Sequence, residues 1–474
     1  MVTGPVPMRT RLILGSGALA FGVKDAGFSY FLLIFYNQVL GMNAGVVGAA
    51  LGLALIVDAL IDPLLGYLSD RTYTRWGRRL PWLYVAPIPL AFVWVLLWTP
   101  PGGEAPGFWG LFGICVVLRL LLSACEVPSV ALIPEITSGY DERTTLFRYR
   151  FLFGWSGGLL MMALAFSVFM PGEQGTLRAD GYFGWAVAGA VIMVLSVMGS
   201  AMGLHRQVAR LPAFKPPPFS WRNAFAELAE AFRERAFLIF AGGALAAYVS
   251  QGITVSLTQY VNTFVWRFDA RAFSFFPLVL VVSVVIMFAI VSPLHRRFGK
   301  PATAAGAALT ALAIGFTPYI LLFGGLWPQP GAAASTALYF AFVIGSNTAG
   351  IVTVISATSM VAEIVEAFQA RTGRRAEGSF YAGNWLVQKC ATGAGIFLSG
   401  QIVALAQIPD NAAPGSVPLA SLGTMIALYA GVSLVLTLVT AWFLARFPIT
   451  RADHEARVAA LDAAARATPD HSIS

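Results

Sequence analysis

Long runs of apolar residues follow one another along the chain, separated by short polar segments, and they lack the alternation typical of barrel strands. Each run is about 20 residues or longer, the length that a helix needs to cross a bilayer. Because only helices and closed barrels satisfy their backbone groups in lipid, the pattern predicts an all-α polytopic membrane protein. The twelve expected spans lie near residues 12–40, 45–70, 81–99, 107–137, 146–170, 182–204, 237–265, 271–294, 301–324, 332–361, 378–407 and 418–445.

Composition and charge distribution support this prediction. Hydrophobic residues make up 57% of the chain and charged residues 11%, whereas a soluble domain carries about 25% charge. The net charge of +8 does not indicate a nucleic-acid partner, because most Lys and Arg residues lie in alternate loops or at the termini. This positive-inside pattern predicts a multi-pass protein of the cell (inner or plasma) membrane with both termini cytoplasmic. The exceptions are Lys24, Arg119, Arg178, Arg267, Arg271 and Lys389.

The longest polar break divides the chain into two halves. It begins with a proline-rich tether and continues with apolar residues at helical spacing, which predicts an interfacial helix. The basic turn "RWGRRLPW" after the second span corresponds to "RRFGKPAT" after the eighth, which indicates an internal repeat, as in secondary transporters. The expected divisions are residues 1–204 (six-helix bundle), 205–236 (cytoplasmic linker), 237–445 (six-helix bundle) and 446–474 (cytoplasmic tail).

Two carboxylates interrupt the second apolar run. Asp58 and Asp62 are four residues apart, so on a helix they project from one face. A charge at the bilayer centre costs about 2.5–3.5 kcal/mol on insertion scales, so such residues indicate a functional site. A pair of adjacent acids can hold a proton or present several oxygens to a hard cation such as Na⁺. The alternative is a structural role, in which the acids only pair with Lys389 or Arg150.

The segment "DALIDPLLGYLSDRTYTRWGRRLPW", which contains these acids, resembles the signature of the glycoside–pentoside–hexuronide:cation symporters, the melibiose permease branch of the major facilitator superfamily. The segments "FLLIFYNQVLG", "EVPSVALIPEIT", "DERTTLFRYR" and "EIVEAFQARTGRRAEGSFYAGNWLVQK" also fit, in order. The resemblance extends to about residue 445. It implies the major facilitator fold, with twelve transmembrane helices in two six-helix bundles.

The resemblance implies a cation site. Asp58 and Asp62 fall on the family's two cation-site acids, and Ser123 stands where the permease has a threonine ligand. The permease's asparagine ligand is replaced here by Ile61. The loss of an amide oxygen weakens a Na⁺ site, whereas a proton needs only a carboxylate. We therefore favour H⁺ as the coupling ion, with Na⁺ bound by Asp58 and Asp62 as the alternative.

The resemblance also implies a solute site. Glu126 occupies the position of a sugar-binding aspartate, and Arg150 matches an arginine of the sugar pocket. Lys389 matches the lysine of the eleventh span that lies near the cation site. Val130 replaces the tryptophan that stacks on the sugar, which argues against a galactoside.

Three other charged residues in apolar spans are candidate solute ligands. The family's first-span sugar aspartate aligns with Gly22, and Asp25 follows three residues later beside Lys24. Arg119 precedes Glu126 by seven residues on the same helical face. It forms either an intrahelical charge network or, together with Lys24, a site for a carboxylated solute such as a hexuronide.

A further set of residues is expected to gate the cytoplasmic side. In the turn after the second span, glycine would permit close helix approach, and Asp70 would pair with basic residues to latch one state. Acids that end the tenth span would pair with the basic turns, or alternatively form a solvated edge. The gating candidates are Gly66, Asp70, Arg75, Gly77, Arg78, Arg79, Glu363, Glu366, Arg371 and Glu377.

These features predict a symporter that couples a sugar, glycoside or hexuronide to H⁺ or Na⁺ by alternating access. Two alternatives remain open: a carrier of lysophospholipid-like amphipaths, and a non-transporting membrane sensor. We expect a monomer with no bound cofactor and no enzymatic activity. "GWSGG" matches the hydrolase pattern G-x-S-x-G, but it lies in an apolar helix and the four histidines lie in cytoplasmic segments. No P-loop motif indicates ATP as the energy source.

Overall fold

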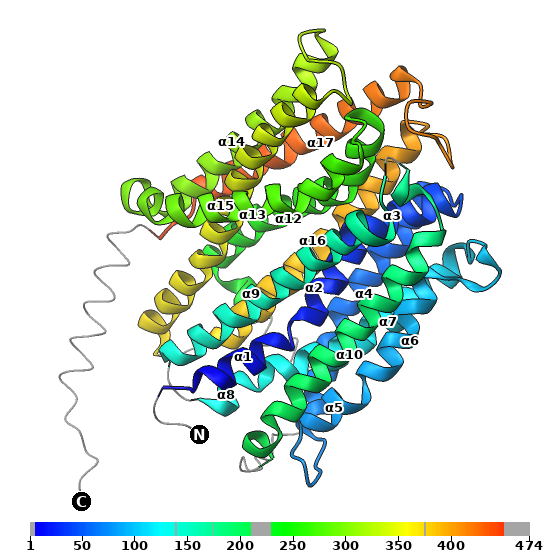
Figure 1. The fold of residues 1–474 in the computed structure, drawn as a ribbon. Helices are drawn as coiled ribbons and strands as arrows, with labels where there is room; N and C mark the ends of the chain where they lie inside the picture. Colours follow the sequence, from blue (N-terminus) through cyan, green and yellow to red (C-terminus); the bar gives the residue numbers. More distant parts are fainter. Residues whose placement is uncertain (1–4, 138–139, 173, 210–228, 374–375, 450–474) are drawn as a thin grey trace, which may run out of the picture.

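The computed structural model describes residues 5–137, 140–172, 174–209, 229–373 and 376–449. All regular elements in these residues are helices, as Figure 1 shows. The predicted amphipathic segment of the linker falls mostly on residues 210–228, and the tail extends beyond residue 449, so both lie largely outside the described residues. The adjoining helices bound the linker more narrowly than predicted, because one ends at Val208 and the next long helix begins at Arg235.

The described residues of the first half form helical stretches at the six predicted spans, two of which are interrupted by short π-helical turns. In chain order the elements are α1 (Met8–Ser16), α2 (Leu19–Ala26), η1 (Gly27–Phe31), α3 (Leu32–Ile34), η2 (Phe35–Val39), α4 (Ala44–Asp70), α5 (Leu80–Val85), α6 (Pro87–Trp98), η3 (Pro101–Gly103), α7 (Gly107–Ala131), α8 (Ile133–Ile136), α9 (Tyr140–Leu164), η4 (Ala165–Phe169), η5 (Gly175–Leu177) and α10 (Asp180–Val208).

The described residues of the second half form helical stretches at the other six predicted spans, with fewer interruptions. Its elements are α12 (Arg235–Tyr260), η6 (Val261–Val265), α13 (Ala270–Phe298), α14 (Lys300–Phe323), α15 (Ala333–Thr372), α16 (Glu377–Leu405) and α17 (Leu419–Ala445).

Ten helical stretches among the described residues are long and apolar enough to cross a membrane. The remaining two predicted spans correspond to α5 with α6, which meet at Ala86, and to α16, a helix of 29 residues that carries Lys389. The prediction of an all-helical, multi-pass membrane protein is confirmed.

The central contact of the fold joins two helices from opposite ends of the sequence. Helix α4 packs along α16, α12 also packs against α16, and α13 contacts α9 and η4. In Figure 1, α13, α14, α15 and α17 lie on one side of the molecule, and α5, α6, α7 and α10 lie on the other. The division into two six-helix bundles that rock as units stays a prediction.

Paired glycines allow α4 and α16 to approach closely. A Cβ atom on Gly52 would lie 2.6 Å from the carbonyl oxygen of Gly393, and one on Gly48 would lie 2.9 Å from the Cα of Gly400. The prediction that Gly66 serves close helix approach is wrong, because a Cβ there would meet only the Cγ1 of Val127, at an ordinary 3.6 Å. Close approach therefore occurs nearer the start of α4, at Gly48 and Gly52.

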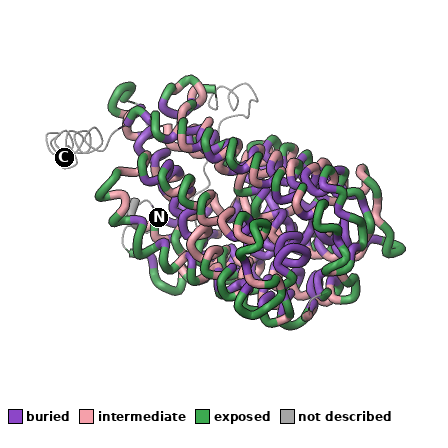
Figure 2. Tube along the Cα trace, turned by 90° about the horizontal axis from the view of Figure 1, so that it is seen from above, coloured by how far each residue is buried: buried purple, intermediate pink, exposed green. Residues whose placement is uncertain are grey.

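Side-chain burial follows the arrangement of the helices. Figure 2 shows buried segments running through the middle of the molecule and exposed segments along its outside. Large apolar side chains project from the outside, including Phe92, Trp109, Leu195 and Phe288. Such an apolar exterior fits a chain whose outer surface faces lipid rather than water.

Candidate cation and solute site

Asp58 and Asp62 lie one helical turn apart on α4, as their spacing predicted. The helix begins at Ala44 after the N-cap Asn43, whose side-chain oxygen accepts hydrogen bonds from the backbone N–H groups of Gly45 (3.0 Å) and Val46 (3.2 Å). This N-cap satisfies two of the four free donors at the start of the helix.

Asp58 is buried and accepts hydrogen bonds on both carboxylate oxygens. Ser123 of α7 donates to Oδ1 at 3.0 Å. Arg119, one turn earlier on α7, donates to Oδ2 at 3.2 Å, and Lys389 of α16 donates to the same oxygen at 2.9 Å. The desolvation of Asp58 is thus offset by one hydroxyl and two positive charges.

Asp62 shares Lys389 with Asp58 but is less enclosed. Its Oδ2 accepts from the Lys389 Nζ at 2.5 Å, and its side chain is 26% exposed. Its Oδ1 is buried and has no hydrogen-bond partner among the described residues. Lys389 therefore bridges the two acids of α4 from a helix of the other half.

Arg119 lies against Asp58 rather than in the intrahelical network with Glu126 that the sequence suggested. Its guanidinium also lies over the ring of Phe28 in η1, with 4.5 Å between Cζ and the ring centroid. Sequence reasoning missed Phe28, since nothing in its local pattern distinguishes it from other core aromatics. The position of Arg119 assigns it to the cation site in our interpretation, not to the solute site.

Lys24, Asp25 and Glu126 form a second, more open charged group. The Lys24 Nζ lies 2.9 Å from the Asp25 Oδ1 and 3.8 Å from the Glu126 Oε2. The Asp25 side chain is 68% exposed and that of Glu126 is 36% exposed. Carboxylate oxygens that remain accessible in this way can accept hydrogen bonds from hydroxyl groups of a solute.

Arg150 is buried on α9. It donates to the Ser129 hydroxyl of α7 at 2.6 Å and lies over the Phe21 ring at 5.4 Å. The alternative in which Arg150 pairs with the acids of α4 does not hold among the described residues, where Lys389 and Arg119 take that place.

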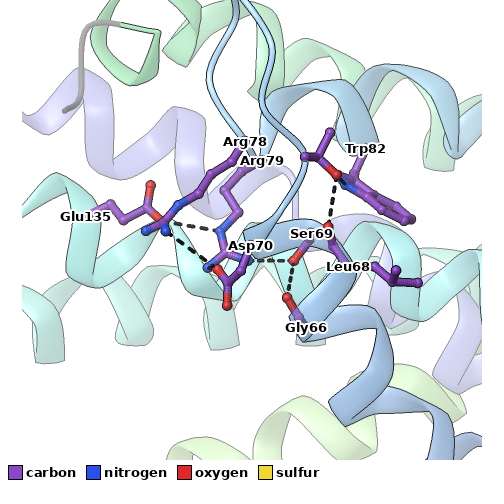
Figure 3. A network of polar contacts seen from close by, with 9 residues as sticks. Gly66, Leu68, Ser69, Asp70, Arg78, Arg79, Trp82 and Glu135 are labelled. Atoms are coloured by element: carbon purple, nitrogen blue, oxygen red, sulfur yellow. Dashed lines mark hydrogen bonds and ion pairs between the residues drawn. The ribbon is translucent and has the colours of Figure 1, made fainter. Parts of the chain in front are cut away.

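The end of the helices that carries the basic turns, called the basic end below, has a polar network around Glu135 of α8 (Figure 3). Arg78 contacts Glu135 at 2.6 Å and Asp70 at 3.8 Å. Arg79 pairs with Asp70, contacts Glu135 at 3.2 Å and donates to the Ser69 hydroxyl at 2.5 Å. Sequence reasoning did not single out Glu135, although it is the second of the two acids in the quoted segment "EVPSVALIPEIT".

Two other gating candidates lie in the turn before this network. Gly77 has φ +86°, a conformation that side chains with a Cβ rarely adopt, and its N–H donates to the Thr74 carbonyl at 3.0 Å. Arg75 is exposed and lies over the Trp76 ring.

The second half has its own ion pairs at the basic end. Glu363 of α15 pairs with Lys300, at the start of α14, at 2.7 Å, and Arg371 pairs with Glu234. Glu366 lies on α15 and Glu377 begins α16 at the same end. The Lys300–Glu363 pair, like those around Glu135, joins residues of the same half, and the Arg371–Glu234 pair joins α15 to the residue just before α12.

Hydrogen bonds between the halves hold the other end of the helices together, called the opposite end below. Asn37 of η2 donates to Asp410 at 2.7 Å and accepts from the Tyr260 hydroxyl at 2.8 Å. The Gln38 side chain accepts from the backbone N–H of Ala412 at 2.9 Å. None of these residues was a sequence candidate, because each is an ordinary polar residue whose partner is remote in the chain.

A profile described as MFS/sugar transport protein matches residues 13–451. An uncharacterised symporter of Synechocystis sp. is 27% identical, over 85% of this chain and 88% of that one. An isoprimeverose transporter of Lactiplantibacillus pentosus is 32% identical over 40% of each chain. Among solved structures, the nucleoside transporter NupG covers 94% of this chain and all of its own, with a TM-score of 0.62 at 18% identity. At this identity the likeness shows the fold alone.

Proposed function

Since the chain belongs to the MFS/sugar transport protein family, whose members are transporters and not enzymes, we propose that it couples the transport of a sugar, glycoside or hexuronide to the entry of H⁺ or Na⁺. The major facilitator fold and the symporter relatives provide the premise. The solute, the coupling ion and the roles of individual residues belong to the proposal.

One observation carries the proposal. Lys389 of α16 reaches across to α4 and contacts both Asp58 and Asp62, at 2.9 and 2.5 Å. Buried ionisable groups in membrane spans are costly unless paired, so this bridge ties the two halves together through charge. A cation that bound the acids would compete with Lys389 and weaken that tie.

The mechanism follows from this competition. The coupling ion neutralises the acids of α4, and Lys389 leaves at least one of them. Glu126 and Arg150, on α7 and α9, then bind hydroxyl or carboxylate groups of the solute. Because the coupling free energy is reciprocal, bound solute raises the affinity for the ion by the same factor.

Alternating access requires the two ends to open in turn. The contacts of Asn37 with Asp410 and Tyr260 hold the opposite end closed. At the basic end, the Glu135 network and the Lys300–Glu363 pair stay within their own halves, so neither has to break for that end to open. We infer from the charge distribution that the basic end is cytoplasmic and that this conformer faces the cytoplasm.

A thermal-shift screen of the purified protein tests the solute class. Glycosides, pentosides, hexuronides and lysolipids are each added with and without Na⁺ at two pH values. A ligand that binds the native state raises the melting temperature by mass action. We expect a sugar or hexuronide to do so. A rise with lysolipids alone would show instead that the cavity serves an amphipath.

Uptake into proteoliposomes then separates a transporter from a sensor. The solute found by the screen should accumulate inside vesicles only when an inward ion gradient is imposed. Solute that binds but never accumulates under a proton or a Na⁺ gradient would refute the symport proposal and favour a sensor.

A further inference from the structure

Arg119 places a permanent positive charge beside the acid pair. Its Nη1 lies 3.2 Å from the Asp58 Oδ2, its side chain is 8% exposed, and the ring of Phe28 covers the guanidinium. Arginine does not lose its proton in proteins. The charge therefore stays at Asp58 whatever the protonation state of the neighbouring groups.

The charges at the site already balance before any ion arrives. Asp58 and Asp62 contribute two negative charges, and Arg119 and Lys389 contribute two positive ones. From α2, Lys24 lies within electrostatic range of Asp58. The charge of Lys24 is itself paired with the carboxylates of Asp25 and Glu126. The segments α3 and η2, which also pack against α4, carry no charged side chain.

The two cations of the site differ in how easily they can leave. Lys389 is 27% exposed and holds a point charge on a flexible stem, so it can swing away when an acid is neutralised. Arg119 is enclosed between Asp58 and Phe28, and its planar head is fixed on both sides. Only the Lys389 contact is therefore suited to being made and broken.

This arrangement of charges and hydrogen bonds favours the binding of a proton over the binding of a Na⁺ ion. A hard cation needs several oxygen ligands, but both oxygens of Asp58 already accept hydrogen bonds, and Arg119 would repel a cation placed next to them. A proton needs one oxygen. The Oδ1 of Asp62, buried and without a hydrogen-bond partner among the described residues, is available to take a proton, and Lys389 can then leave the neutral acid for Asp58.

We propose that Arg119 is a built-in counter-ion of Asp58 that excludes Na⁺ and restricts coupling to protons, which Asp62 carries. A proton from water adds to Asp62, and the ion pair between Asp62 and Lys389 breaks. On the other side of the membrane the proton returns to water and the ion pair forms again. This inference rests on the proposed symport function and specifies its coupling ion.

Binding of Na⁺ to the purified protein tests the inference without any solute. The melting temperature is measured at about pH 8.5 in NaCl and in choline chloride of equal concentration, for the wild type, Arg119→Gln and Arg119→Lys. We expect no difference between the salts for the wild type. Arg119→Gln removes the charge and adds an amide oxygen, so NaCl should raise its melting temperature by about 2 °C or more relative to choline chloride. Arg119→Lys keeps the charge and should respond like the wild type.

Stabilisation of the wild type by Na⁺ would overturn the inference, as would a folded Arg119→Gln protein that does not respond to Na⁺. Uptake by the wild-type protein tests whether the coupling ion is H⁺ or Na⁺ without any variant. Accumulation of the screened solute under a proton gradient but not a Na⁺ gradient supports it, and accumulation driven by Na⁺ refutes it while leaving the symport function intact. No accumulation under either gradient would instead refute the proposed function itself.

Discussion

At the residue scale, three donors from two helices surround the carboxylate of Asp58. Ser123 and Arg119 reach it from α7, and Lys389 reaches it from α16. Asp62 has Lys389 as its ion-pair partner among the described residues, and the hydroxyl of Ser123 lies near it. Two acids that look equivalent in the sequence therefore have different environments, and they should respond differently to the same substitution.

Asp58→Asn should lower the free energy of unfolding by about 3–5 kcal/mol, because it leaves Arg119 buried without its acid. Asp62→Asn should cost much less, because Lys389 keeps Asp58 as a partner. Both variants should lose gradient-driven uptake. Thermal unfolding and proteoliposome uptake measure the two effects, with Asp180→Asn as a control, since the Asp180–Arg178 pair is exposed. Accumulation at wild-type levels by Asp62→Asn would contradict its role as the proton carrier.

Lys389→Ala should impair coupling more than folding. Asp58 keeps Arg119 and Ser123, and the partly exposed Asp62 can take up a proton, so the folded protein should persist in purifiable amounts. Accumulation under a gradient should fall at least tenfold, because no charge then ties ion binding to α16. Arg178→Ala, which removes an exposed pair, is the matched control. If the only effect of Lys389→Ala were loss of folded protein, the contact would be structural.

At the element scale, the contact of α4 with α16 depends on small residues as well as on charge. Gly48 and Gly52 face Gly400 and Gly393, and the two backbones meet where side chains would keep them apart. Small residues of this kind are the usual means of close helix packing in membranes. The charge bridge of Lys389 lies on the same pair of helices, so the glycines set the distance over which it acts.

Gly52→Ala should destabilise the protein by about 1–3 kcal/mol, because its Cβ would meet the Gly393 backbone, which cannot turn aside. Gly350→Ala is the matched control, since a Cβ at that position on α15 meets nothing within 4 Å. The control should be neutral or stabilising by up to about 1 kcal/mol through helix propensity. Melting temperatures compare the two, and equal values would show that α4 and α16 do not need this contact.

At the scale of the whole molecule, the described contacts between the halves are unevenly distributed. Asn37, Tyr260 and Asp410 connect them at the opposite end, whereas the ion pairs described at the basic end stay within each half. A protein in this conformer can exchange solute at the opposite end only after the contacts between the halves at that end change. Transport should therefore depend on breaking the bond between Asn37 and Asp410.

A cysteine pair at these two positions tests this dependence. Asn37→Cys with Asp410→Cys, in a background with Cys390→Ser, should lose uptake when the cysteines are cross-linked. A reducing agent that opens the cross-link should restore uptake. Each single-cysteine variant serves as the control and should be insensitive to oxidation. Uptake that continues in the cross-linked protein would show that the opposite end does not open during transport.

The sequence by itself determined the helical, multi-pass architecture. The length of each apolar run and the distribution of charge between the loops are local properties, and they decide directly how a segment lies in a bilayer. It also located Asp58 and Asp62, since their four-residue spacing places them on one face of any helix. The sequence offered Lys389 as a partner of these acids only beside Arg150, because Lys389 is 327 residues from Asp62 in the chain and spacing does not decide between the two.

Only the tertiary structure decided which charges meet. In the structure Arg119 pairs with Asp58 rather than with Glu126, and Arg150 donates to Ser129. Glu135 accepts a hydrogen bond from an arginine of the basic turn. The structure also shows that close helix approach occurs at Gly48 and Gly52 rather than at Gly66. Helical periodicity predicts which face of its helix a side chain lies on. The partner on that face depends on how the other helices pack, and this packing cannot be predicted from a local sequence pattern.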